Sequence, residues 1–135
     1  MDFSKDYIEP EKKLLGVWIK PSEDEDVEFR VRPYSQTTYY LAIGEEMEVR
    51  KIEIDAIADK IKREAEYRKI INQKLVEIFL LDWKNVSVGG EQIPFSVEKA
   101  TDLLLGSESF MKLFNKAVNM VTESVEKRDE EVEKN

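Results

Sequence analysis

The most regular pattern in the chain is an apolar stripe with helical spacing in its middle third. Residues 45–88 contain neither Gly nor Pro, and their apolar side chains recur at steps of three and four, with one gap at Arg68. Such spacing places the side chains on one face of a helix. The pattern predicts a single amphipathic helix over about residues 52–81. The stripe consists of Ile54, Ile57, Ile61, Ala65, Ile71, Leu75, Ile78 and Phe79.

An alternating pattern nearer the start of the chain predicts a β-hairpin. Residues 27–32, VEFRVR, alternate apolar and charged side chains, as a strand with one buried face does. The apolar run at residues 14–20, LLGVWIK, supplies the other strand, and residues 21–26, PSEDED, supply an acidic turn. We expect this hairpin to span residues 14–33 and to end at Pro33, which cannot donate a ladder hydrogen bond.

Polar and glycine residues predict where the other elements begin and end. Ser35 is a suitable N-cap for a short helix over residues 36–43, which Gly44 is expected to end. Residues 82–95, DWKNVSVGGEQIPF, contain Asn, Ser, Gly-Gly and Pro. This composition predicts a loop, with a small hairpin around Gly89 and Gly90.

Two further serines predict the starts of the last two helices. Ser96 is expected to cap a helix that runs through Leu105, with Gly106 placed to end it. Ser107 is expected to cap the final helix. Its predicted apolar face consists of Phe110, Leu113, Phe114, Ala117, Val118, Val121 and Val125.

These elements together predict an α+β fold with a mainly α-helical body and a small N-terminal β-hairpin. Residues 1–13 are polar and are expected to form a loose leader. Residues 14–126 are expected to form one domain, with the hairpin at 14–33 and the helical body at 35–126. Residues 127–135 are strongly charged, so we expect a flexible tail there.

Composition narrows the classes of function. The chain has 135 residues, a formal net charge of −8, and neither His nor Cys. It therefore has no disulfide, no thiolate metal site and no imidazole base. We expect no cofactor and no enzymatic activity. We also expect no binding to nucleic acid or to a membrane, because phosphates repel an acidic surface. No apolar run is long enough for a membrane span, and the N-terminal residues do not resemble a signal peptide, so we expect a cytoplasmic protein that is not secreted.

Four aromatic residues are the candidate partner-binding residues. Trp83 and Phe95 flank the predicted loop, where they either pin the loop to the body, which we favour, or anchor a partner. Phe110 and Phe114 lie on the final helix. The acidic run at residues 23–26 is interpreted as a solvated turn, because it lacks the spacing of a calcium-binding loop.

Two segments carry a resemblance to a known family. Residues 80–86, LLDWKNV, and 93–100, IPFSVEKA, resemble tail assembly chaperones of long-tailed, siphovirus-type bacteriophages. In that family a long helix ends in a Leu-x-Asp/Gly-Trp-x-x-Val segment, and a Pro-Phe-Ser/Thr starts the next helix after a Gly-containing turn. Residues 29–34, FRVRPY, resemble the family's strand that ends in Arg-Pro. The similarity covers about residues 14–121.

The resemblance implies a non-enzymatic protein that binds the tail tape-measure protein and recruits tail-tube subunits. It also implies action in the host cytoplasm and absence from the mature virion. Two alternatives remain open. One is a generic interaction or regulatory module that acts through the long amphipathic helix, and the other is a small carboxylate- or metal-dependent hydrolase. The partner-binding surface and the oligomeric state do not follow from the sequence.

Overall fold

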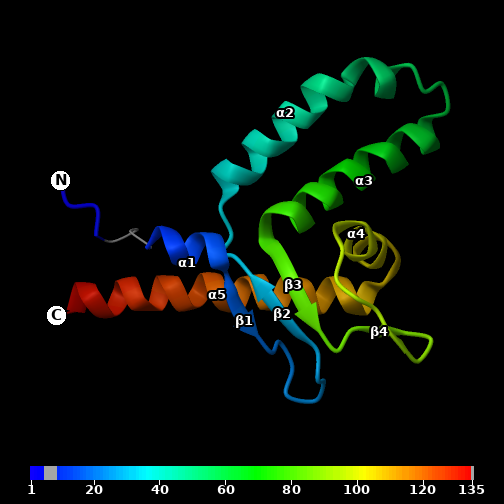
Figure 1. Cartoon of the computed structure of the whole chain (residues 1–135). Coiled ribbons are helices and arrows are strands. Elements are labelled where there is room, and N and C mark those ends of the chain that lie inside the picture. Colours follow the sequence, from blue (N-terminus) through cyan, green and yellow to red (C-terminus); the bar gives the residue numbers. More distant parts are fainter. Residues whose placement is uncertain (5–8, 135) are drawn as a thin grey trace.

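The computed structural model describes residues 1–4 and 9–134, with the backbone alone described for residues 12–13 and 124–134. The fold is α+β and mainly helical, which confirms the predicted class (Figure 1). In chain order the elements are α1 Pro10–Leu15, β1 Val17–Ile19, β2 Glu28–Val31, α2 Gln36–Asp55, α3 Lys60–Phe79, β3 Leu80–Lys84, β4 Ser87–Val88, β5 Glu91–Gln92, α4 Val97–Gly106 and α5 Glu108–Lys134.

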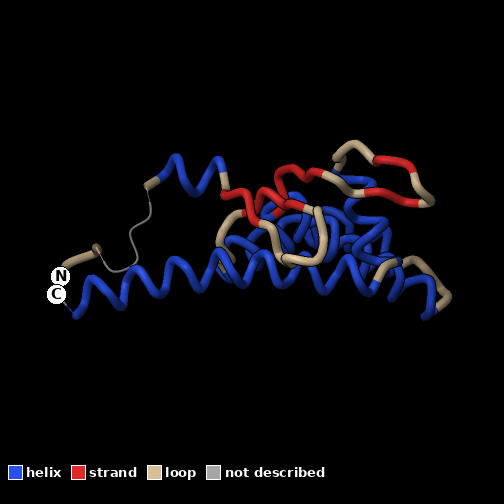
Figure 2. Tube along the Cα trace, turned by 90° about the horizontal axis from the view of Figure 1, so that it is seen from below, coloured by secondary structure: helices blue, strands red, loops and turns tan. Residues whose placement is uncertain are grey.

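The predicted β-hairpin is confirmed, but its first strand is shorter than predicted, since Leu14 and Leu15 belong to helix α1. The hairpin is part of a three-stranded antiparallel sheet with the order β1-β2-β3. Across β2 and β3, Glu28 lies opposite Lys84 and Arg30 lies opposite Asp82. Cross-strand pairs of opposite charge favour this register. The sheet and the long helix α5 lie in adjacent layers (Figure 2).

Strand β3 corrects the prediction that residues 82–95 form a loop after a helix ending at 81. Helix α3 ends at Phe79, and Leu80 is its C-cap in an extended conformation. Residues Leu80–Lys84 then pair with β2, so a partner distant in sequence determines their conformation. The small hairpin predicted around Gly89 and Gly90 is confirmed, since β4 and β5 pair on either side of it.

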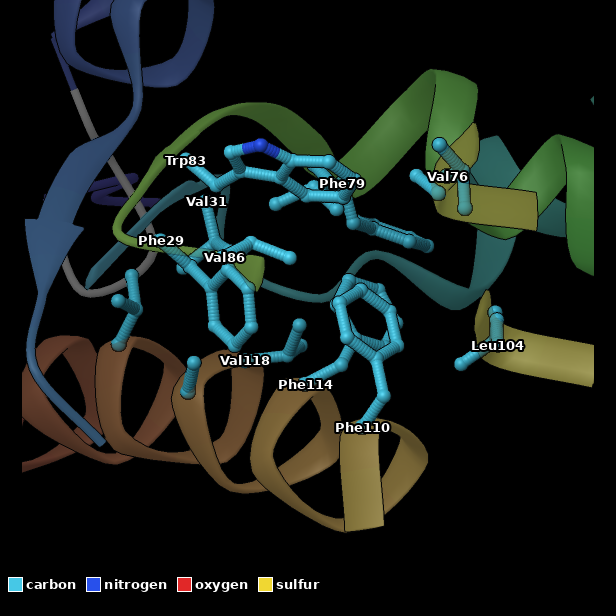
Figure 3. Close-up of a cluster of buried hydrophobic side chains, with 14 residues drawn as sticks. Phe29, Val31, Val76, Phe79, Trp83, Val86, Leu104, Phe110, Phe114 and Val118 are labelled. Carbon is cyan, nitrogen blue, oxygen red and sulfur yellow. The ribbon is translucent and has the colours of Figure 1, made fainter. Parts of the chain in front are cut away.

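The core lies between the sheet and helices α3, α4 and α5. Figure 3 shows that rings and aliphatic side chains from these elements converge there. We call this part of the molecule, formed by β1–β3, α4 and α5 together with the C-terminal end of α3, the body. Its buried hydrophobic residues are Phe29, Val31, Val76, Phe79, Leu80, Trp83, Val86, Ala100, Leu104, Phe110, Phe114, Ala117, Val118 and Val121.

The last two helices begin as predicted. The Ser96 hydroxyl accepts a hydrogen bond from the Lys99 amide at 3.1 Å, and the Ser107 hydroxyl accepts one from the Phe110 amide at 3.2 Å. Each bond satisfies an amide that has no partner within the helix. Helix α4 includes Gly106, one residue beyond the predicted end.

The two ends of the chain contain more helix than predicted. Helix α1 begins at Pro10, inside the predicted leader 1–13, and the Arg32 guanidinium donates hydrogen bonds of 2.8 and 3.1 Å to the Leu14 carbonyl. Helix α5 continues to Lys134, so the backbone of the predicted tail is helical, and its flexibility stays a prediction. Residues 5–8, Asn135 and the side chain of Val125 lie outside the described residues.

Candidate partner-binding surface

Trp83 is a core residue that pins the segment after β3 to the body through Ile93, as the favoured interpretation predicts. Its side chain is 6% exposed. The indole Nε1 donates a 2.7 Å hydrogen bond to the carbonyl of Ile93, which satisfies the only polar atom of a buried ring. In Figure 3 the ring lies over the buried side chains between the sheet and the helices.

The other three candidate rings lie in or against the same core. Phe95, which is half-buried, meets Trp83 edge to face with the ring centroids 5.2 Å apart. Phe110 packs edge to face against Trp83 at 5.9 Å and against Phe29 at 5.5 Å. Phe114 is buried in the same cluster. The structure thus brings all four candidates to the core, where Trp83, Phe110 and Phe114 are buried and Phe95 is partly exposed. Their binding to a partner stays a prediction.

One group of exposed apolar side chains lies on a part of the molecule that the sequence pattern misassigned. The predicted single helix over residues 52–81 is wrong: α2 ends at Asp55, α3 begins at Lys60, and the two form an antiparallel helical hairpin (Figure 1). We call α2, residues 56–59 and α3 the α2–α3 hairpin. The alternative function predicted an interaction module that acts through one long amphipathic helix. Because that helix is two helices, such a module would act through the α2–α3 hairpin.

Asp59 causes the break between the two helices. Its carboxylate accepts hydrogen bonds from the amides of Ile61 and Lys62 at 2.8 and 3.2 Å, which makes it the N-cap of α3. The chain turns there without Gly or Pro, because an Asp side chain satisfies the free amides of a new helix start.

Helix α2 also runs through Gly44, where the sequence predicted an end. The N-terminal start is as predicted, since the Ser35 hydroxyl accepts from the Thr38 amide at 3.4 Å. Beyond Gly44, ion pairs with α3 favour the helical conformation. A carboxylate oxygen of Glu46 lies 3.6 Å from the Lys74 Nζ. A guanidinium nitrogen of Arg50 lies 3.5 Å from a carboxylate oxygen of Glu66. These tertiary contacts outweigh the low helix propensity of a single glycine.

The base of the hairpin is fixed to the body by tyrosines. Tyr34 and Tyr39 pack against Phe79 with centroid separations of 5.3 and 6.3 Å. Burial raises the pKa of Tyr39, and the neighbouring Tyr34 and Tyr40 raise it further. The Tyr34 amide also donates a 3.0 Å hydrogen bond to the Thr122 hydroxyl on α5.

Farther from the body, the hairpin has its own small set of buried residues. Ile54 on α2 and Ile70 on α3 are each 1% exposed, and neither belongs to the core cluster of the body. Lys74 links the two helices, and its hydrogen bond with Glu77 raises its pKa, as do the negative charges of Glu77 and Glu46.

The outward face of α2 carries three large aliphatic side chains in solvent. Leu41 is 63% exposed, Val49 80% and Ile52 85%. On α3, close to the turn, Ile61 is 79% exposed. Sequence reasoning missed Leu41 and Val49 because it ended one helix at residue 43 and began the next at 52. Treating residues 36–55 as one helix would place Leu41, Val49 and Ile52 on one side of it.

No membrane-spanning or metal-binding arrangement occurs in the part of the chain that the structure describes. None of the helices there combines the length and apolar character that crossing a bilayer requires. Within the same residues, no three acidic side chains gather closely enough to form a metal site.

Comparison with known proteins gives one family. The family model described as YdaY prophage protein matches residues 26–135, which is well over half of the chain. No curated protein and no solved structure shows significant similarity to this chain.

Proposed function

The chain belongs to the YdaY prophage protein family, and from this premise we propose that it is a non-enzymatic tail assembly chaperone. In this role it binds the tape-measure protein and recruits tail-tube subunits to it. It acts in the host cytoplasm and is absent from the mature virion. The prophage family and the resemblance of residues 80–86 and 93–100 to phage tail chaperones support this proposal.

The observation that carries the proposal is the exposed aliphatic surface on the α2–α3 hairpin. Leu41, Val49 and Ile52 are all more than half exposed on one helix, although exposing large aliphatic side chains to water costs free energy. Such a surface is typical of a protein that binds another protein. A net charge of −8 also suits a protein that keeps an aggregation-prone partner soluble, because like charges keep the complexes apart.

A second candidate function is a regulatory module that binds a different partner through the same hairpin. The observation that favours this function is the position of α2 at the outside of the molecule. Helix α2 packs mainly along α3 and forms an outer layer of the molecule (Figure 1), so its outward face is accessible to any helix or strand of suitable chemistry.

Co-expression with the tape-measure protein of the same prophage tests the chaperone proposal. We expect the tape-measure protein to be soluble and to copurify with this chain, and to precipitate when it is expressed alone. A tape-measure protein that never copurifies, and whose solubility is the same with and without this chain, would overturn the proposal. Copurification with a different phage or host protein in place of the tape-measure protein would favour the regulatory module.

The gene order gives an independent check. A tail assembly chaperone gene is expected between the tail-tube gene and the very long tape-measure gene. Mass spectrometry of purified virions checks the last part of the proposal, since peptides of this chain should be missing from them.

A further inference from the structure

The outward face of α2 has a chemical pattern that defines what it can bind. We call it the α2 outer stripe, and all of its six side chains are exposed. Their spacing along the helix places them on one side of it. From the first to the last residue the stripe extends roughly 21 Å, at 1.5 Å of rise per residue. Its members are Leu41, Glu45, Glu48, Val49, Ile52 and Asp55.

The acids of the stripe differ from the acids on the rest of α2. Glu46 and Glu53 form ion pairs with Lys74 and Arg50. By contrast, none of the ion pairs found among the described residues involves the stripe's own acids, Glu45, Glu48 and Asp55. Within the described residues, the stripe therefore presents exposed aliphatic side chains beside carboxylates that form no ion pair.

We propose that the α2 outer stripe docks one face of a basic amphipathic helix in the partner. The aliphatic side chains of that helix would cover Leu41, Val49 and Ile52, while its Lys or Arg side chains would face the stripe's three carboxylates. A helix laid along a helix matches both patterns over their whole length. This inference rests on the proposed function in taking the tape-measure protein as the partner that carries such a helix.

A second copy of this chain fits the stripe poorly. In an antiparallel pairing centred on Glu48, the two copies of Glu48 face each other and Leu41 lies near Asp55 of the other copy. In a parallel pairing, Glu45 and Glu48 each lie opposite the same residue of the other copy. Both arrangements place carboxylates against carboxylates or against aliphatic side chains, which costs free energy. Charge complementarity thus selects a basic partner over self-association.

The test uses the full-length protein and two synthetic helical peptides of about three heptads each. Both have Leu at the core positions, and one has Lys at the flanking positions where the other has Glu. Binding is measured by fluorescence anisotropy at about 0.15 M salt, where screening weakens nonspecific attraction. We expect the protein to bind the Lys peptide and to leave the Glu peptide unbound. An absence of Lys-peptide binding would overturn the proposal.

Two double charge reversals separate a defined surface from general attraction. Glu45→Lys with Glu48→Lys should weaken Lys-peptide binding about tenfold or more and should create binding to the Glu peptide. Glu23→Lys with Glu25→Lys, in the exposed turn between β1 and β2, changes the net charge equally and should weaken binding less than about twofold. Equal weakening by the two double variants would overturn the proposal.

Substitutions of the aliphatic side chains test the other half of the pattern. Val49→Ser with Ile52→Ser should weaken Lys-peptide binding about tenfold, whereas Val88→Ser on β4 should leave it unchanged. An aliphatic double variant that binds as tightly as the natural sequence would overturn the proposal. So would a dimer of the natural sequence that dissociates when Val49 and Ile52 are replaced, because a second copy would then occupy the stripe.

Repeating the co-expression with the two double charge reversals distinguishes failure of this inference from failure of the proposed function. If the tape-measure protein copurifies equally with both, the chaperone proposal stands and the α2 outer stripe is overturned. If it copurifies with neither variant nor the natural sequence, while Lys-peptide binding still depends on Glu45 and Glu48, the stripe stands and the chaperone proposal fails.

Discussion

In the body, aromatic rings from β2, β3 and α5 pack edge to face with centroids 5.5 to 5.9 Å apart, whereas the α2–α3 hairpin is stabilised by aliphatic side chains and ion pairs. The body also gathers elements that are far apart in sequence, such as β2 and β3. In the hairpin, helix α2 packs mainly on α3, which follows it in the chain, while α3 also packs against α4 of the body. Contacts of that local kind form and open more readily than a core built from distant segments.

The buried aromatic rings of the body and the exposed aliphatic side chains of α2 lie in different parts of the molecule. Aromatic residues are the usual anchors of protein interfaces, yet here Trp83, Phe110 and Phe114 are buried within the fold. The exposed aliphatic residues Leu41, Val49 and Ile52 lie on a strongly charged helix, where they are easily overlooked in a sequence. The exposed aliphatic side chains of α2 are therefore separate from the aromatic residues that stabilise the core.

Removing the Trp83 ring should produce the largest loss of stability. Trp83→Ala deletes a buried ring and its hydrogen bond to the Ile93 carbonyl, so we expect the free energy of unfolding to fall by about 3–5 kcal/mol. Chemical denaturation checks this. Trp18→Ala is the matched control, because Trp18 lies half-buried on the other face of the sheet and should cost clearly less. If Trp83→Ala and Trp18→Ala lower the free energy of unfolding equally, the edge-to-face cluster contributes no more to stability than a half-buried ring does.

Removing the Ile54 side chain should affect the hairpin more than the body. Ile54→Ala opens a cavity at a side chain that is 1% exposed, and we expect a cost of about 2–3 kcal/mol, because a site near the free end of the hairpin can partly collapse. Ile52→Ala, two residues away but 85% exposed, should cost less than about 0.5 kcal/mol.

Hydrogen exchange shows where the Ile54→Ala cost is felt. Amides of α2 should exchange faster in this variant, while amides of β2 and β3 should keep their protection. Equally faster exchange in both regions would contradict the idea that the hairpin can open while the body stays folded.

The parts of the fold that follow from sequence are those determined by neighbouring residues. The serine caps at Ser35, Ser96 and Ser107 each satisfy an amide within three residues, so the starts of three helices are readable. The alternation of residues 27–32 likewise identifies β2, since one buried face needs an apolar residue at every second position.

The parts that do not follow from sequence depend on distant partners or on a competing signal. β3 directly follows the apolar end of α3, and it is a strand only because its backbone pairs with that of β2. The break at Asp59 contains no Gly or Pro, and an Asp within a helical pattern is as easily read as a surface charge. The exposed stripe on α2 is visible only once residues 36–55 are known to form one helix.

Gly44 offers a test in the opposite direction, because its replacement should stabilise the hairpin. Gly44 lies inside α2, and an added Cβ would meet no atom within 4 Å. Gly44→Ala should therefore raise the free energy of unfolding by about 0.5–1 kcal/mol, since alanine loses less backbone entropy in a helix.

Gly16→Ala is the matched control in the body. Gly16 has a φ of +67°, and an added Cβ would lie 2.9 Å from the Val31 carbonyl oxygen and from the Leu81 side chain. This substitution should destabilise the protein, because alanine rarely adopts that conformation and the neighbouring backbone cannot give way. Thermal unfolding measures both changes in stability. If Gly44→Ala and Gly16→Ala change the stability in the same direction, the helical assignment of Gly44 is contradicted.

The smallest expected effect is a loss of hairpin stability at high pH. The Glu77 hydrogen bond and the charges of Glu77 and Glu46 raise the pKa of Lys74 above its ordinary value of 10.5, and burial raises the pKa of Tyr39 above 10.0. In both cases the folded protein holds the proton more tightly than the unfolded chain does. The stabilisation is therefore complete below the ordinary pKa values and is lost as the pH rises through the folded-state values.

A comparison of lysine variants isolates the Lys74 contribution. Lys74→Met should remove about 0.5 kcal/mol of stability near pH 8, and it should reduce the further loss expected as the pH rises above 10.5. Lys112→Met, which breaks an exposed ion pair with Glu108 on α5, should change neither value appreciably. The difference arises because Lys74 joins two helices, with its side chain 20% exposed, whereas Lys112 pairs within one helix at 74% exposure. If both variants lose stability with pH as the natural sequence does, the bridge between α2 and α3 contributes nothing measurable, and the hairpin depends on its aliphatic contacts alone.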